Sequence, residues 1–285
     1  MSTAASVPGG LAPDNVLRAC PVYLAGPGNT AQIYDTLSEH RWATAATDSG
    51  RMFTSPRQHA QLARLPEGSY GGWKAVEYRE PFGMPLWSAT FSRNTPAEIT
   101  AAFATALAKG LPSRHRDFLS GGTHYQSPNS PARVLAVRGW ETTDTPRHLY
   151  QHSPDEHAAF VLRKNHLDAY AELEGAEPAQ WAMYGGLDQA NPESWQASFT
   201  SATPLHLVRA AVVALTSAEP VERTRGEIPE RHLPYVDVQP VDEEPDPRRS
   251  AALARTPNAS GPRTADLSAS AAAASLPLPA PSRRH

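Results

Sequence analysis

One segment of the chain has the glycine spacing of a nucleotide-binding loop. Glycines 26 and 28 precede a predicted helix, and Asp48 lies twenty residues beyond Gly28. In such loops, backbone amides and a helix N-terminus hold a phosphate, and the acidic residue binds the ribose. Residues 43–47, however, lack the Val- and Ile-rich run of a buried parallel strand, and no Lys-Ser/Thr pair follows the glycines. We therefore predict a turn that leads into a helix, and no cofactor.

Three histidines and an aspartate form a second candidate site. His148, His152, Asp155 and His157 are of the residue types that bind metals. Their spacing crosses a predicted Ser-Pro turn, and only His157 has a counterpart, His59, in the other half of the chain. Because metal ligands must share one focus, exposed or hydrogen-bonded histidines are favoured over a metal site.

The remaining reactive side chains give weaker signals. His115 and His124 lie in a predicted linker, and Cys20, the single cysteine, precedes the expected folded region. A nucleophilic thiol would need a nearby base. No Gly-x-Ser-x-Gly motif and no duplicated carboxylate pair is present. The sequence thus predicts no catalytic residue and a non-enzymatic protein, with an uncharacterised enzyme as the least favoured alternative.

The spacing of the six tryptophans indicates the elements that would position these groups, because it shows a duplication. A shift of 98 positions carries Trp42 onto Trp140, and a shift of 108 carries Trp73 onto Trp181 and Trp87 onto Trp195, so the second copy has ten extra residues. Residues that recur in both copies are expected to be architectural. The predicted core of the repeats comprises Trp42, Trp73, Trp87, Phe91, Trp140, Trp181, Trp195 and Phe199.

Each copy is predicted to end in a helix. Thr95 and Pro96, with Glu98 behind them, fit a capping box in which Thr is the N-cap and Pro the first helical residue. Thr203 and Pro204 repeat the start of this pattern. Apolar residues follow at helical spacing in both copies, so each helix is expected to pack against a sheet that carries the tryptophans.

The fold class expected from these patterns is α+β, with two tandem helix–antiparallel-sheet–helix repeats and a disordered C-terminal tail. A flexible leader covers residues 1–20, with a short helical turn at 13–19. The first repeat, 21–109, opens with a strand at 22–24 and a helix to about residue 40. The remaining boundaries are a linker at 110–121, a second repeat at 122–218, and a Pro/Ala/Arg-rich tail at 219–285. Within that tail, residues 232–238 are apolar enough to dock back or to bind a partner.

Charge and composition restrict the partners. The net charge is −3, so no strong basic field attracts nucleic acid or anionic membrane. Trp73-Lys74 and Arg93 could stack and hold bases, but their counterparts are Trp181-Ala182 and Ser201. We expect a cytoplasmic module with a protein partner. Nucleic acid is less favoured, a membrane is not expected, and the oligomeric state is not indicated.

The order of motifs resembles a known family. Tyr23-Leu-Ala-Gly-Pro-Gly28, a helix, a tryptophan, Ser-Pro, and then Trp-x-Ala-[Ser/Thr]-Phe before Thr-Pro resemble the SPDY domain, domain-of-unknown-function family 317, of Streptomyces-type actinobacteria. The resemblance covers about residues 21–217. Ser153-Pro154-Asp155 is closest to the naming motif, whereas the first copy has Arg57 in place of the aspartate. Since the family has no established activity, the resemblance implies a binding or regulatory module and no catalytic residue. The divergent loops at 48–56 and 163–180 are expected to carry partner contacts.

Overall fold

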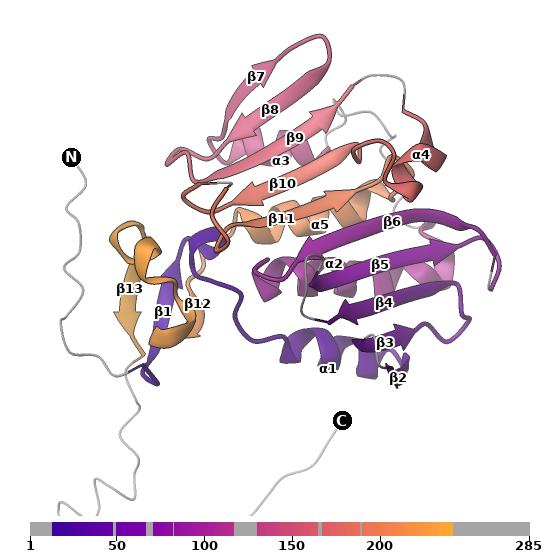
Figure 1. Cartoon of the computed structure of the whole chain (residues 1–285), viewed down its shortest axis with the longest axis horizontal. Coiled ribbons are helices and arrows are strands. Elements are labelled where there is room, and N and C mark those ends of the chain that lie inside the picture. Colours follow the sequence, from indigo (N-terminus) through magenta and orange to yellow (C-terminus); the bar gives the residue numbers. More distant parts are fainter. Residues whose placement is uncertain are drawn as a thin grey trace, which may run out of the picture. The chain divides into compact units, whose positions relative to one another are not determined.

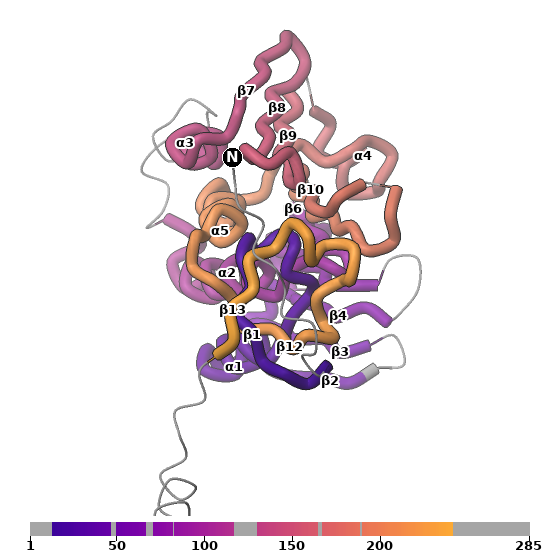
Figure 2. The backbone as a smooth tube through the Cα atoms, turned by 90° about the vertical axis from the view of Figure 1, so that its left-hand side faces the viewer, coloured from indigo at the N-terminus to yellow at the C-terminus, as the bar shows by residue number. Residues whose placement is uncertain are grey.

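The protein forms a ten-stranded antiparallel sheet, a three-stranded sheet, and a layer of helices against the larger sheet (Figures 1 and 2). The structure, a computed structural model, describes residues 13–47, 50–66, 71–81, 83–116, 130–164, 167–188 and 190–241. The predicted α+β class is confirmed.

The two halves of the chain share one order of elements. The first has α1 (Ala31–Glu39), β2 (Ala43–Thr47), β3 (Gly50–Thr54), β4 (Ala60–Leu65), β5 (Gly72–Tyr78), β6 (Pro85–Ser92) and α2 (Ala97–Gly110). The second has α3 (Pro131–Val137), β7 (Glu141–Asp144), β8 (His148–His152), β9 (Ala158–Arg163), α4 (Ala169–Glu174), β10 (Trp181–Gly185), β11 (Trp195–Phe199) and α5 (Leu205–Leu215). Helix α4 occupies the stretch in which the second copy is longer. Each half is therefore a helix, a five-strand meander and a helix.

The halves join through their last strands, and the strand order is β2-β3-β4-β5-β6-β11-β10-β9-β8-β7. At the seam, Thr90 pairs with Ser198, its own equivalent under the 108-residue shift, and their hydroxyls lie 2.6 Å apart. On either side, Phe91 pairs with Ala197 and Ala89 with Phe199. Because equivalent residues exchange places across it, the seam has a local twofold relation.

The core lies between this sheet and the helix layer, in which α2 packs against α5 (Figure 2). Phe103 of α2 meets Trp87, Phe91 and Phe199 at ring-centroid distances of 5.2–6.1 Å. All six tryptophans are at most 6% exposed. Trp42 and Trp140 lie just before β2 and β7, and the other four lie on strands. Large rings of this kind supply most of the apolar area that such a core buries.

The expectations for the N-terminal segment were wrong in two places. Val16–Cys20 form strand β1, where a helical turn in a flexible leader was expected, and β1 is the central strand of the sheet β12-β1-β13. Val22–Leu24 form the 3-10 helix η1 and not a strand. All three side chains of η1 are buried, which a tight turn permits and the two-sided alternation of a strand does not. Cys20 is thus part of the folded region.

The predicted disordered tail begins too early. Val221–Thr224 form β12, Arg225–Glu227 form η4, Glu230–Tyr235 form η5 and Asp237–Pro240 form β13. The polar composition of this segment suggested disorder, but its buried polar side chains have hydrogen-bond partners in the fold. Arg223, 2% exposed, donates to both carboxylate oxygens of Glu98 at 2.7 Å, and His232 Nδ1 lies 2.9 Å from the carbonyl of Leu24. Residues 232–238 therefore dock back on the fold. Residues 1–12 and 242–285 lie outside the described residues.

The predicted linker and helix caps also differ from the structure. Gly110 is the last residue of α2, and Leu111–Ser113 form the 3-10 helix η2, while residues 117–129 lie outside the described part. Pro96 and Pro204 are the N-caps, and neither helix has a side-chain cap. The hydroxyl of Thr95 donates to the Gln196 carbonyl across the seam at 3.3 Å, and Thr203 is buried. Glu98 does not close a capping box because its carboxylate is bound to Arg223.

Candidate ligand pocket of the first copy

The two Ser-Pro turns have the same geometry and are architectural. Ser55 Oγ accepts the amide of Ala60 at 3.0 Å, and Ser153 Oγ accepts that of Ala158 at 2.9 Å. The third residue after each serine, Gln58 or Glu156, has a φ near +60°. Because both copies need these contacts to connect neighbouring strands, the shared Ser-Pro and His-Ala residues mark the fold and not an activity. A site specific to one copy must be sought where the copies differ.

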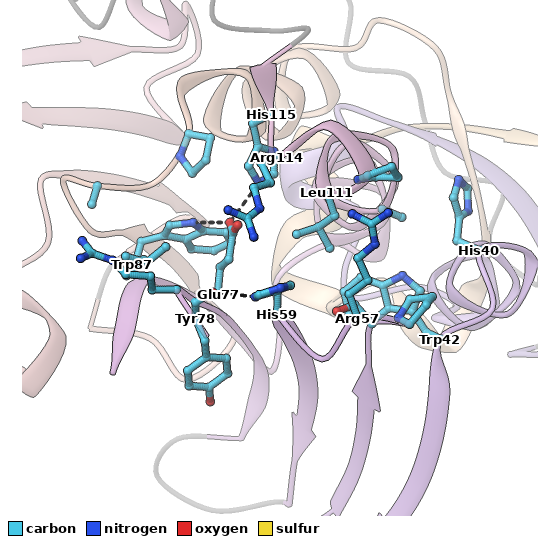
Figure 3. Close-up of a pocket in the computed structure, with 18 residues that line it drawn as sticks. His40, Trp42, Arg57, His59, Glu77, Tyr78, Trp87, Leu111, Arg114 and His115 are labelled. Carbon is cyan, nitrogen blue, oxygen red and sulfur yellow. Dashed lines mark hydrogen bonds and ion pairs between the residues drawn. The ribbon is translucent and has the colours of Figure 1, made fainter. Parts of the chain in front are cut away.

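A cavity of about 460 Å³ lies beside the turn of the first copy (Figure 3). Its walls come from the turn, the paired ends of β5 and β6, the end of α2 with the residues after it, and the start of α5. Apolar lining residues are Trp42, Pro56, Leu86, Trp87, Ala108, Leu111, Pro112, Ala202 and Pro204, and polar ones are His40, Ser55, Arg57, His59, Glu77, Tyr78, Arg79, Arg114 and His115. The size and mixture are those of a small-ligand or side-chain site.

A buried carboxylate joins two walls of this cavity. Glu77 pairs with Trp87 across strands β5 and β6, and its Oε2 accepts the indole Nε1–H at 2.7 Å. The same oxygen lies 2.9 Å from Nε2 of His115, which enters from the chain beyond α2. The side chains of Glu77 and His115 are 10% and 7% exposed. The two hydrogen bonds stabilise a carboxylate that is buried from water. The bond from Trp87 also fixes the position of that ring.

The second nitrogen of His115 is directed away from the carboxylate and lacks a hydrogen-bond partner among the described residues. It faces Gly110, where an added Cβ would come within 2.4 Å of it. The ring of His206 lies 5.0 Å away by centroid distance. Burial, and then the neighbouring His115, lower the pKa of His206 to about 4, so His206 is neutral at physiological pH. The two rings thus lie against the end of helix α2, which needs a glycine at position 110 to admit them.

Positive charge surrounds the mouth of the cavity. Arg57, Arg79 and Arg114 are exposed, and none of them forms an ion pair with another described residue. His59 and His40 also line it, each with its Nδ1 near a backbone carbonyl of the first copy. The one carboxylate in the lining, Glu77, is engaged by His115. The rim is therefore suited to an anionic group and the walls to an apolar one.

The equivalent place in the second copy is filled by the chain itself. Gly185 stands where the first copy has Glu77, and it pairs with Trp195 as Glu77 pairs with Trp87. Trp195 Nε1 donates to the carbonyl of Tyr23 at 3.0 Å, and the Tyr23 hydroxyl donates to Asp155 at 2.8 Å. The Tyr23 ring meets Trp140 edge-on, with centroids 6.5 Å apart.

A backbone contact also holds the segment that contains Tyr23. The carbonyl of Pro27, in this segment, accepts the amide of Ala97, the first residue of α2, at 2.8 Å. Leu205, the first residue of α5, is the equivalent of Ala97, and its amide has no acceptor among the described residues. Tyr235 of η5 lies edge-on to His157 at 4.7 Å. The matched tryptophans are thus alike in burial, but the space beside them is occupied in one copy and open in the other.

The glycine loop predicted as a helix entry has a packing role. Gly26 has a φ of +84°, and a Cβ there would lie 2.3 Å from the carbonyl of Glu227. A Cβ on Gly28 would overlap the guanidinium of Arg223. The Oδ1 of Asn29 accepts the amide of Ala31, which opens α1. The loop therefore lies against the C-terminal segment, and Asp48 lies outside the described residues.

The histidine cluster is not brought together around a common point. His148 stacks near Tyr150 and His157 near Tyr235, while Asp155 accepts the hydroxyl of Tyr23. Across the ranges that the structure covers, no three His, Cys, Asp or Glu side chains are placed to hold a metal. His152 is exposed.

Cys20 is not activated. Its pKa is raised by burial and by the nearby Asp237, which disfavours the thiolate that a nucleophile requires. His124 lies outside the described residues.

Sequence analysis missed several lining residues: Glu77, Arg79, Arg114 and the role of His115. Glu77 and Gly185 are aligned by the 108-residue shift, so their difference was a readable signal. The contact between Glu77 and His115, by contrast, spans 38 residues and depends on where α2 ends. No local pattern reports such a contact.

The fold and site define an α+β protein with a duplicated unit and an open pocket beside the Ser-Pro turn of the first copy. Within it, residues 54–112 and 152–221 each match the family model of SPDY, a domain of unknown function (DUF317). The two matches agree with two copies, and they begin at the two Ser-Pro turns. No curated protein and no solved structure matches the chain. In the described ranges, no helix has the length and apolar character that a membrane crossing requires.

Proposed function

We propose that this protein is a non-enzymatic, cytoplasmic binding module in which the pocket of the first copy receives an aromatic group of a partner protein. One observation carries the proposal: the same place in the second copy already holds Tyr23, with its ring against Trp140 and its carbonyl on Trp195. The chain thus contains its own example of how this fold accepts an aromatic residue.

The geometry does not favour catalysis. A Glu–His pair could serve acid–base chemistry if the free histidine nitrogen faced a substrate. In this site Nε2 of His115 is bound to Glu77, and Nδ1 faces Gly110. Because Nε2 is engaged and Nδ1 lies against the glycine of α2, we assign the pair to the support of the wall.

Nucleic-acid stacking is also disfavoured as the function. Base stacking needs exposed aromatic faces. The tryptophans that suggested it are buried between the sheet and the helices, and Trp73 is 6% exposed.

Uniform labelling with 5-fluorotryptophan provides the test, because the protein has six tryptophans and two of them, Trp42 and Trp87, line the pocket. We expect small aromatic probes to shift the ¹⁹F signals of these two residues and to leave the other four unchanged. The probes are p-cresol, 4-methylbenzylamine and phenyl phosphate, which differ in charge. Trp42→Phe and Trp87→Phe assign the signals.

Ala202→Phe is the blocking variant, since Ala202 is exposed and lines the cavity. Ala45→Phe, at an exposed position on β2, is its matched control. Loss of the shifts in the first variant and retention in the second would support the proposal. Shifts that spread over all six signals, or no response to any probe, would refute it.

A further inference from the structure

The pocket of the first copy differs from the filled one at the positions that touch the ends of Tyr23. In the second copy, the phenol hydroxyl donates to Asp155, the third residue of the Ser-Pro turn. Burial and the Asp155 carboxylate raise the pKa of Tyr23, so a neutral phenol is the species held there. A carboxylate at this position selects a hydrogen-bond donor at the tip of the ring and repels an anion.

Arg57 occupies this turn position in the first copy and lines the open cavity. Replacing an acceptor by a guanidinium reverses the requirement, because Arg offers only donors and pairs best with carboxylates and phosphates. Arg79 and Arg114 add positive charge at the same mouth, and none of the three has an ion-pair partner in the described ranges. Figure 3 shows Leu111 between Arg57 and Arg114, two of the residues that line the cavity.

The far end of the pocket has changed as well. Trp195 offers its indole N–H to the backbone of the occupant, but the N–H of Trp87 is already taken by Glu77. Oε2 of Glu77 accepts both described hydrogen bonds, and Oε1 accepts none from the described residues. A ligand therefore meets a carboxylate oxygen beside Trp87, whereas Tyr23 meets an N–H beside Trp195.

We infer that the first-copy pocket binds an aromatic ring that carries an anionic group at its tip, in the way that the second copy holds the neutral phenol of Tyr23. The inference rests on the proposed binding function and names its ligand chemistry. The apolar walls take the ring, and Arg57 with its neighbouring arginines takes the anion. Two sources present this chemistry: a phosphotyrosine side chain of a partner protein, and a free aryl acid.

Titration with phenyl phosphate and p-cresol, at low salt and monitored by the Trp42 and Trp87 signals, tests the inference. We expect phenyl phosphate to bind at least tenfold more tightly than p-cresol, and this advantage to shrink as salt is added. In Arg57→Asp, which installs the second copy's residue type, phenyl phosphate should lose at least tenfold in affinity while p-cresol binding is retained. Arg133→Asp, at an exposed position on α3, is the charge-matched control and should change neither.

A phosphotyrosine peptide and its unphosphorylated form separate the two sources. Tighter binding of the phosphopeptide than of phenyl phosphate supports a protein ligand, and equal binding supports a free aryl acid; either result supports the chemistry. Equal or tighter binding of p-cresol or 4-methylbenzylamine in the wild type would overturn the inference and leave the binding function standing. An unaltered affinity in Arg57→Asp would also overturn it, and no binding by any probe would overturn both proposals.

Discussion

Replacing Glu77 tests whether the buried carboxylate holds the pocket wall. Its Oε2 accepts from Trp87 Nε1 at 2.7 Å and contacts His115 Nε2 at 2.9 Å, and both side chains of the Glu77–His115 pair are at most 10% exposed. Glu77→Gln has the same shape, and its amide oxygen in the place of Oε2 can still accept from both donors, but the negative charge is lost. A hydrogen bond to a charged group contributes about 1.5–3 kcal/mol and a neutral one about 0.5–1.5 kcal/mol, so the loss of charge should cost about 1 kcal/mol for each bond.

Glu77→Ala removes the accepting oxygen and leaves two buried donors without partners. Breaking a buried pair in this way costs about 3–5 kcal/mol. We therefore expect the free energy of unfolding to fall in the order wild type, Glu77→Gln, Glu77→Ala. Urea denaturation followed by circular dichroism measures these values without relying on the altered Trp87 environment.

Glu141→Gln, at an exposed position on β7, is the control and should stay within about 0.5 kcal/mol of the wild type. If Glu77→Ala were as stable as this control, the carboxylate would not be the element that joins β5 to the segment after α2. The assignment of His115 to the wall would then also fail.

Three further predictions concern other contacts. Glu98→Ala should lower the melting temperature more than Arg223→Met, because the Arg223 side chain is 1% exposed and would lose its partner, whereas Glu98 is 26% exposed and can reach water; equal losses would contradict this account. Tyr23→Phe should cost about 1.5–3 kcal/mol in urea denaturation, since it removes the hydrogen bond to Asp155 and keeps the ring; an unchanged midpoint would argue against the filled pocket. The pKa of His206 is lowered to about 4, so the unfolded chain takes up its proton first, and stability should fall as pH drops from about 6.5 through 4. His206→Gln should flatten this part of the pH profile, and an unaltered slope would refute the assignment.

Sequence patterns predicted the parts of the fold that depend on local spacing. Apolar residues at helical spacing behind Thr95-Pro96 and Thr203-Pro204 located helices α2 and α5. The tryptophan shifts identified the duplication before any coordinate was known, because a copied core must keep its largest residues at fixed intervals.

The features that escaped prediction depend on contacts between distant parts of the chain. The Arg223–Glu98 pair spans 125 residues, and it turns a polar stretch into a folded one. The contact between Tyr23 and Asp155 spans 132 residues, and it explains why η1 is a buried turn and not a strand. Composition reports average polarity and cannot show that a charged residue has a partner elsewhere.

The pocket was not found from the sequence for a related reason. Sequence patterns draw attention to side chains clustered along the chain, such as His148, His152 and His157, and not to residues that only the fold brings together. The open pocket collects a few residues from each of several elements far apart in the sequence and becomes visible when the copies are compared position by position. Arg57 against Asp155 and Glu77 against Gly185 are the substitutions that distinguish an open cavity from a filled one.

The β6–β11 seam has a consequence for a single unit of this fold. Since Thr90 faces its own counterpart, and Phe91 and Ala89 exchange partners around it, the contact is isologous. An unduplicated unit could therefore form a homodimer through the same strand edge, with two identical vacant clefts. When both units belong to one chain, the two clefts can differ. In this protein one cleft is filled by Tyr23, and the other is open.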